Sequence, residues 1–279
     1  MCSRNWGQHR DVRTMNTTPD FCLRKWYLDC VAENGDTFVG YSATLQWKAW
    51  ALHYSSITTL CGNSALRTET SLRKSSFPHV SEGHIDWSSK PLHIRGTWTL
   101  MAEPICRTPY DSPDGKVTWS CVQPRAKADI SFGTNGHIAG LGYAELLELT
   151  IKPWHLPIAE LRWGRFLSGR DVIVWIQWQG VTPLSLVFHN GGQIGNALIT
   201  DEQLSMDGGR TILSLSERTE LRKGDLVSTT LSAIPGVAAI VPDRMLHTFE
   251  CKWRSKGVLV TDGSSQSTGW AIHEIVRFP

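Results

Sequence analysis

The stretch that decides the fold is GLGYAELLELTIKPWHLPIAELRWGRF, which runs from Gly140 to Phe166. Its first half has the composition of a β-strand, yet it carries two glutamates among its leucines. Successive side chains of a strand point to opposite faces. One face therefore contains Tyr143, Glu145, Leu147 and Leu149, and the other contains Gly142, Ala144, Leu146 and Glu148. A carboxyl group next to a tyrosine, on a strand otherwise made of leucines, needs an explanation.

The composition is that of a folded globular protein. The 279 residues are enough for one large or two medium domains. Hydrophobic residues make up 41% and charged residues 19%. The formal net charge of +2 gives no electrostatic reason to expect nucleic acid or an anionic membrane as a partner. The 13 tryptophans fit a deep apolar cavity, and they fit equally a β-rich core that uses this side chain.

The cysteines indicate a reducing compartment. There are seven, an odd number, and no C-x-x-C spacing occurs, which argues against a disulfide framework or a structural zinc site. The first residues lack the apolar core of a secretory signal, and no run of about 18 apolar residues exists to span a membrane. We expect a cytoplasmic protein with reduced thiols, no metal ion and no cofactor.

Strand signals recur along the chain. The turn ENGD at 33–36 precedes a β-rich run, and Asn-Gly between two such runs is a strong hairpin signal. Strands are predicted at 36–47, 92–103, 116–132, 137–149, 171–180, 184–190, 211–217, 225–234, 245–253, 257–263 and 269–278. Turn signals every 8–15 residues predict an all-β sandwich or barrel. After Pro157, the segment 158–167 allows a short helical turn, and 153–169 is the expected domain junction.

Two readings of Glu145 remain open at this point. If its face lines an apolar cavity, desolvation would raise the pKa of the carboxyl and keep it protonated, which makes a proton donor. If the face is solvated, Glu145 is an ordinary surface charge. Arg165 likewise either stacks on an indole or pairs with a carboxylate in a pocket, or clamps the junction. His155, beside Trp154, is either a pocket residue or a packing residue of the junction.

Three segments together resemble the AttH-like and carotenoid 1,2-hydratase (hydroxyneurosporene synthase) family. KWYLDCVAENGDTFVGYSATLQW at 25–47 resembles its opening W-Y-x-D, turn and strand signature. The stretch from Gly140 to Phe166 is similar to its central G-x-G-Y-x-D and W-x-W-G-R block. GWAIHEIVRF at 269–278 resembles its closing strand. The order and spacing of these short motifs, from about residue 25 to the end, carry the resemblance.

The resemblance implies two lipocalin-like β-barrel halves around an apolar cavity. The expected organisation is an N-terminal extension at 1–24, a first domain at 25–155 and a second at 156–279. It also implies that Glu145 and Tyr143 are catalytic, with Glu145 in place of the acid that protonates an alkene. The substrate-binding residues that we predict are Trp119, Trp154, His155, Trp163 and Arg165. The acid is Glu where the family has Asp, and LLEL replaces a polar run, so the implied fold is better supported than hydration itself.

The sequence leads to three functional hypotheses. The first is an acid-base enzyme that hydrates, cyclises or isomerises an alkene in a terpenoid- or polyketide-like small molecule, with Glu145 as the acid. The second is a non-catalytic lipocalin-like carrier of a hydrophobic ligand, which does not need Glu145. The third is a pericyclase that acts by shape and hydrogen bonds. In each of them the partner is a hydrophobic small molecule.

We expect all seven cysteines to be reduced in the native protein, since their spacing suits neither disulfides nor zinc. Thiol titration of freshly purified protein under denaturing, non-reducing conditions should count seven free thiols. A count lower by two or more would show a disulfide and contradict the expected compartment.

Overall fold

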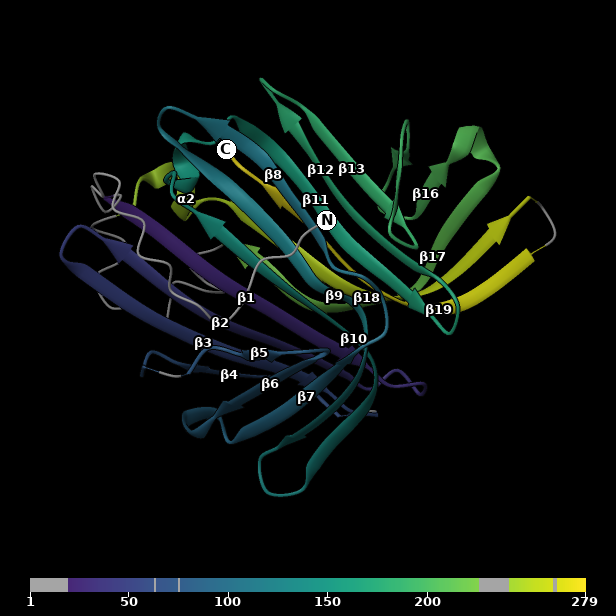
Figure 1. The fold of residues 1–279 in the computed structure, drawn as a ribbon, viewed down its shortest axis with the longest axis horizontal. Helices are drawn as coiled ribbons and strands as arrows, with labels where there is room; N and C mark the ends of the chain where they lie inside the picture. The colour runs from purple at the N-terminus through teal and green to yellow at the C-terminus, as the bar shows by residue number, and fades with distance from the viewer. Residues whose placement is uncertain (1–19, 63, 75, 226–240, 263–264) are drawn as a thin grey trace. The chain divides into compact units, whose positions relative to one another are not determined.

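The computed structural model describes residues 20–62, 64–74, 76–225, 241–262 and 265–279. The chain divides into two compact units, one ending at Pro153 and the other beginning at Trp154. In the described residues both units are built almost entirely from antiparallel strands (Figure 1). The helical elements described are three-residue 3₁₀ turns and the four-residue helix α2. None of them is long and apolar enough to cross a membrane.

The N-terminal unit is a ten-stranded sheet in the order β4-β3-β2-β1-β10-β9-β7-β6-β5, with β8 paired to β9. Its strands are β1 (Phe21–Val31), β2 (Thr37–Trp47), β3 (Trp50–Leu60), β4 (Arg67–Ser71), β5 (His79–Ser81), β6 (His84–Ser89), β7 (Ile94–Leu100), β8 (Ile105–Ser112), β9 (Gly115–Phe132) and β10 (Gly136–Leu149). The turn η1 (Lys90–Leu92) precedes β7. The last strand, β10, returns to pair with the first, β1.

The C-terminal unit repeats this plan in a nine-stranded sheet of order β14-β13-β12-β11-β19-β18-β17-β16-β15. Its strands are β11 (Ile158–Ser168), β12 (Val172–Gly180), β13 (Leu184–His189), β14 (Gly192–Ile194), β15 (Leu198–Ile199), β16 (Gln203–Met206), β17 (Thr211–Asp225), β18 (Phe249–Thr261) and β19 (Ser265–Arg277). The short helical elements are η2 (Pro153–His155), η3 (Asp207–Gly209) and α2 (Asp243–Leu246). Here too the last strand, β19, pairs with the first, β11.

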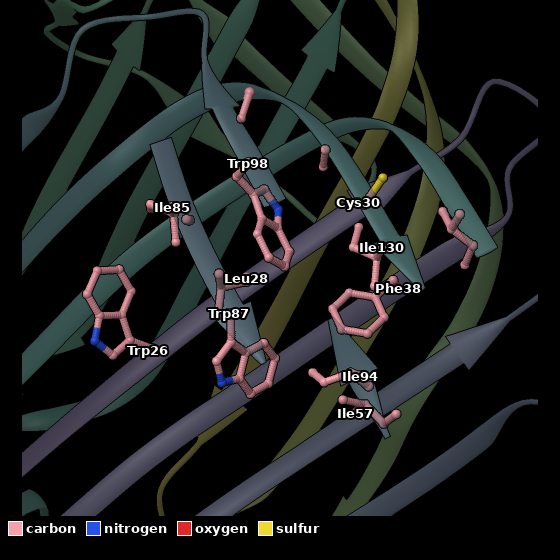
Figure 2. Close-up of a cluster of buried hydrophobic side chains, with 14 of the residues drawn as sticks. Trp26, Leu28, Cys30, Phe38, Ile57, Ile85, Trp87, Ile94, Trp98 and Ile130 are labelled. Carbon is pink, nitrogen blue, oxygen red and sulfur yellow. The ribbon is translucent and has the colours of Figure 1, made fainter. Parts of the chain in front are cut away.

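The core of the N-terminal unit lies on one face of its sheet and is rich in tryptophan. Trp26, Trp87 and Trp98 pack there with aliphatic side chains from β1, β6, β7 and β9 (Figure 2). The indole N–H of Trp98 donates a 2.8 Å hydrogen bond to the backbone oxygen of Asp29, which ties β7 to β1 and satisfies the buried donor. Gly40 leaves the space that the ring of Trp87 fills.

The C-terminal unit has its own core around Phe166 and Trp175. His273 of β19 is buried on the same face, with its ring between those of Trp253 and Trp175, whose centroids lie 5.2 and 6.5 Å away. Its Nε2 atom and the hydroxyl oxygen of Ser255 are 2.8 Å apart. Burial, followed by the charge of Arg218, lowers the pKa of His273 to about 3, so the imidazole is neutral.

The all-β prediction is confirmed, and two of its details are wrong. The segment 158–167 is not helical, because it is β11, paired along its length with β12 and β19. The runs 245–253 and 257–263 are not two strands. Residues 243–246 form α2, and a single strand, β18, extends from Phe249 to Thr261. The strand predicted at 225–234 lies, except for its first residue, outside the described residues. The six described cysteines are free thiols, and Cys2 is not among the described residues.

Gly40→Ala should destabilise the protein, because the added methyl would lie 2.5 Å from Cζ3 of the buried Trp87 ring. Overpacking of this kind costs about 1–3 kcal/mol, and urea denaturation should show it as a lower unfolding midpoint. The control is Gly195→Ala at an exposed site with nothing within 4 Å of the new methyl. The two variants share the entropy change of a Gly→Ala exchange, so equal midpoints would contradict the packing around Trp87.

His273 should make stability depend on pH. The unfolded chain protonates this group near 6.5 and the folded one only near 3, so between these values the unfolded state binds the extra proton. The free energy of unfolding should therefore fall as the pH falls from 6.5 towards 3, by up to about 1.4 kcal/mol per pH unit for one proton. His273→Gln should remove that part of the slope in urea titrations across the range. Identical slopes in the two proteins would show that His273 does not contribute.

Candidate functional site

The two faces of β10 have different surroundings. Ala144 and Leu146 belong to the tryptophan core, and Glu148 on the same side pairs with Arg24 at 2.9 Å. Tyr143 and Glu145 point to the opposite face, as the alternation of the sequence predicts. Both are buried all the same, since Tyr143 has no exposed surface and Glu145 is 7% exposed. The reading of Glu145 as an ordinary surface charge is therefore wrong.

The strand register sets the neighbours of Glu145 on this face. Antiparallel residues that pair directly share a face of the sheet. Cys121 of β9 is paired with Glu145 on one side, and Tyr27 of β1 on the other. Tyr27 is in turn paired with Tyr41 of β2, and their rings meet edge to face with centroids 5.4 Å apart. The four side chains form one row across four strands.

Two donors converge on one oxygen of Glu145. The indole N–H of Trp119 and the phenol O–H of Tyr143 each donate to Oε2, both at 2.6 Å. Trp119 reaches it from β9, two residues before Cys121, and Tyr143 from β10 itself. The structure thus brings together three of the residues singled out from the sequence, and it fixes the orientation of the carboxyl group.

A second tyrosine–carboxylate pair lies on the neighbouring strand. The phenol of Tyr27 donates to Oδ2 of Asp29 at 2.8 Å, and Asp29 has no exposed surface. The register places Tyr27 opposite Glu145 and Asp29 opposite Tyr143, so the two Tyr-x-acid pairs run in opposite directions. Tyr27 and Asp29 are not among the site residues predicted from the sequence. The available signal was their i, i+2 spacing, the same as that of Tyr143 and Glu145.

Burial keeps Tyr143 and Cys121 protonated. It raises the pKa of the Tyr143 phenol well above 10, with Cys121 and Glu145 adding to the effect, so Tyr143 remains a hydrogen-bond donor. Burial also raises the pKa of the Cys121 thiol well above 9, although a hydrogen bond with Tyr143 opposes the shift. Cys121 is therefore a thiol and not a nucleophilic thiolate.

Irregular pairing of β9 shapes this part of the sheet. The register between β9 and β10 shifts twice, between Gly142 and Ala144 and again between Ala144 and Glu145, each time with an extra residue on β9. Pro124, which has no backbone N–H to donate, lies in the first of these bulges. Here β9 also changes its outer neighbour from β8 to β7. Bulges change the direction of the side chains around them. The second bulge, between Ala144 and Glu145, lies immediately beside Glu145.

The remaining predicted site residues belong to the C-terminal unit. Trp154 and His155 lie in η2, where Trp154 is half-buried and His155 exposed, with their rings edge to face at 6.2 Å. Trp163 and Arg165 are buried on one face of β11. The Lys252 ammonium lies 4.7 Å from the Trp163 ring centroid, and Arg165 donates to the backbone oxygen of Trp270 at 2.8 Å. Their contact with a substrate stays a prediction.

Comparisons of the fold give clear matches although comparisons of sequence do not. No protein-family model and no curated protein matches the sequence. The structure of CghA with Sch210972 matches with a TM-score of 0.57 at 13% identity, covering 93% of this chain and 89% of CghA. The AttH-like protein NE1406 of Nitrosomonas europaea matches with a TM-score of 0.52 at 10% identity, covering 92% of each chain.

A weaker likeness links the chain to kievitone hydratase of Nectria haematococca. Its TM-score is 0.44 at 11% identity, with 91% of this chain and 88% of that one covered. At identities this low, shared architecture is what such matches establish. The two stronger matches nevertheless extend over nearly the whole length of all three chains. This chain therefore has the AttH-like fold of two lipocalin-like halves.

Proposed function

We propose that the protein is an acid-base enzyme that protonates an alkene of an apolar, terpenoid- or polyketide-like small molecule, with Glu145 as the proton donor. The observation that carries this proposal is the Glu145 carboxyl, 7% exposed and held through one oxygen by Trp119 and Tyr143. A buried carboxyl with fixed orientation is suited to proton transfer. A carrier of an apolar ligand has no need of one.

The hydrogen bonds suit the charge that develops during this step. In this proposal Glu145 holds its acidic proton on Oε1, since Oε2 already accepts two hydrogen bonds. When it passes to an alkene carbon, the π electrons form the new C–H bond, and the carboxyl becomes a carboxylate. The donors of Trp119 and Tyr143 then face a growing negative charge, and such hydrogen bonds stabilise the transition state more than the ground state.

The aromatic side chains suit the cation that remains on the substrate. Tyr27 and Tyr41 lie in the same row as Glu145, and aromatic faces attract cations. Burial of the row limits the water available to capture the cation early. The likeness in fold to CghA, whose structure was determined with the small molecule Sch210972, supports a small-molecule ligand.

Deuterium exchange tests this function before the natural substrate is identified. The full chain is incubated in D₂O with farnesol, squalene or methyl sorbate, and deuterium in each probe is measured by mass spectrometry. Glu145→Gln keeps the shape of the side chain and its acceptor oxygen, so it should fold normally but incorporate deuterium about 10²–10⁴-fold more slowly. Tyr143→Phe should cost less, since it removes a hydrogen bond that orients the acid and leaves the proton in place.

The matched control is Glu148→Gln. Glu148 is three residues from Glu145 on the same strand but lies on the opposite face, where it pairs with Arg24. This variant should exchange at the wild-type rate. Full activity in Glu145→Gln, or a greater loss in Glu148→Gln, would refute the assignment. Binding of the probes with no exchange in the wild-type protein would favour a carrier instead.

A further inference from the structure

Asp29 is a second buried carboxyl on the face that holds Glu145. It has no exposed surface, and the phenol of Tyr27 donates to its Oδ2 at 2.8 Å. Burying a carboxyl is costly unless the fold gives it partners. An apolar residue at this position of β1 would fill the space without that cost.

Asp29 and Glu145 lie at neighbouring positions on the same face of the sheet, where β1 pairs with β10. Asp29 is paired with Tyr143, and Glu145 is its diagonal neighbour on β10. Diagonal residues across an antiparallel pair have Cα atoms roughly 7–8 Å apart, so the two side chains occupy neighbouring positions on one face. The tyrosines occupy the other diagonal, with ring centroids 6.0 Å apart.

Cys121 and Lys25 are further ionisable groups on this face. Cys121 lies close enough to both carboxyls for each of them to raise its pKa, which places the three groups in one electrostatic neighbourhood. On β1 the nearest cation of this face is Lys25, whose ammonium lies 5.8 Å from the ring centroid of Tyr41. Tyr27 and Tyr143 donate hydrogen bonds to Asp29 and Glu145. Asp29 and Glu145 are both carboxyl groups, which are suited to giving and accepting a proton.

We propose that Asp29 accepts the proton that leaves the substrate after Glu145 has delivered one, so that the enzyme is an isomerase or cyclase rather than a hydratase. This rests on the proposed function of Glu145. Glu145 gives its proton to one alkene carbon and becomes a carboxylate. The Asp29 carboxylate then takes a proton from a carbon next to the cation, and the electrons of that C–H bond form the new double bond.

The overall reaction is balanced. The product has the same formula as the substrate, and no electrons enter or leave. One proton has moved from Glu145 to Asp29 by way of the substrate. Exchange with water after product release returns the two carboxyls to their starting states. A hydratase would need no base to remove a proton from carbon. The product of a hydratase would also be heavier than its substrate by one water.

Two measurements on the same samples separate the roles of the carboxyls. Deuterium in the recovered starting probe reports delivery by Glu145, because the cation can return a proton to Glu145. Formation of a double-bond isomer or cyclised isomer, measured by gas chromatography with mass detection, reports removal by Asp29. The probes are again farnesol, squalene and methyl sorbate, with the full chain in D₂O. Glu148→Gln serves as the unaffected control.

Asp29→Asn should lower isomer formation about 10²–10⁴-fold, while deuterium still enters the starting probe within about threefold of the wild-type rate. Glu145→Gln should lose both readouts. Isomer formation at the wild-type rate in Asp29→Asn would overturn the proposal for Asp29 and leave that for Glu145 intact. Loss of both readouts in folded Asp29→Asn would also overturn it, by showing that Asp29 acts only through Glu145. A product heavier by one water would do the same.

Tyr27→Phe keeps the test decisive if Asp29→Asn does not fold. It retains the Asp29 carboxyl and removes the hydrogen bond that orients it. Isomer formation should fall about tenfold, which is less than the loss of a general base costs, and deuterium entry should fall by much less. Equal losses in the two readouts would refute the role of Asp29. Absence of exchange in every probe with the wild-type protein would instead refute the proposed function itself.

Discussion

The antiparallel pairing of β1 with β10 is the constraint on which the candidate site depends. It joins the first and last strands of the N-terminal unit, and it is what sets Tyr27 beside Glu145 and Asp29 beside Tyr143. The side-chain period of a strand is two, so a slip of one residue would turn Tyr27 and Asp29 into the tryptophan core. The same slip would turn Trp26 and Leu28 out of it. The burial of these apolar side chains therefore fixes the register that assembles the polar face.

One sheet thus serves two purposes on its two faces. The core face contributes rigid aromatic packing. The hydrogen bond from the Trp98 indole to the backbone oxygen of Asp29 fixes β1 where it carries the pair Tyr27 and Asp29. Gln123, from the bulged part of β9, donates a 3.0 Å hydrogen bond to the backbone oxygen of Trp98. The bulge of β9, the core and the backbone of β1 at Asp29 are therefore connected through one residue, Trp98. Such support positions reacting groups more accurately than loops do.

Local patterns in the sequence carried the all-β class, the Asn-Gly hairpin and the faces of β10, because each depends on periodicity or turn chemistry within a few residues. The helical turn that the sequence allows at 158–167 does not form, because pairing with β12 and β19 decides the conformation of this segment. Tyr27 and Asp29 were missed for a related reason. Their local spacing is visible, but their meeting with Glu145 arises only in the folded sheet. The bulges of β9 leave no periodic pattern in the sequence, and Pro124 is the one local sign of them.

The joining of first and last strands also has a consequence for synthesis on the ribosome. β1 can pair with β2 as soon as its hairpin emerges, but its other edge has no partner until β10 has been made. At about 5–20 residues per second, the roughly 120 residues between β1 and the end of β10 take on the order of 6–24 s. Throughout that interval the nascent chain carries an open strand edge next to exposed tryptophans, and such edges template association with other chains. Chaperone capacity during translation would then limit the yield of folded protein more than the stability of the finished sheet.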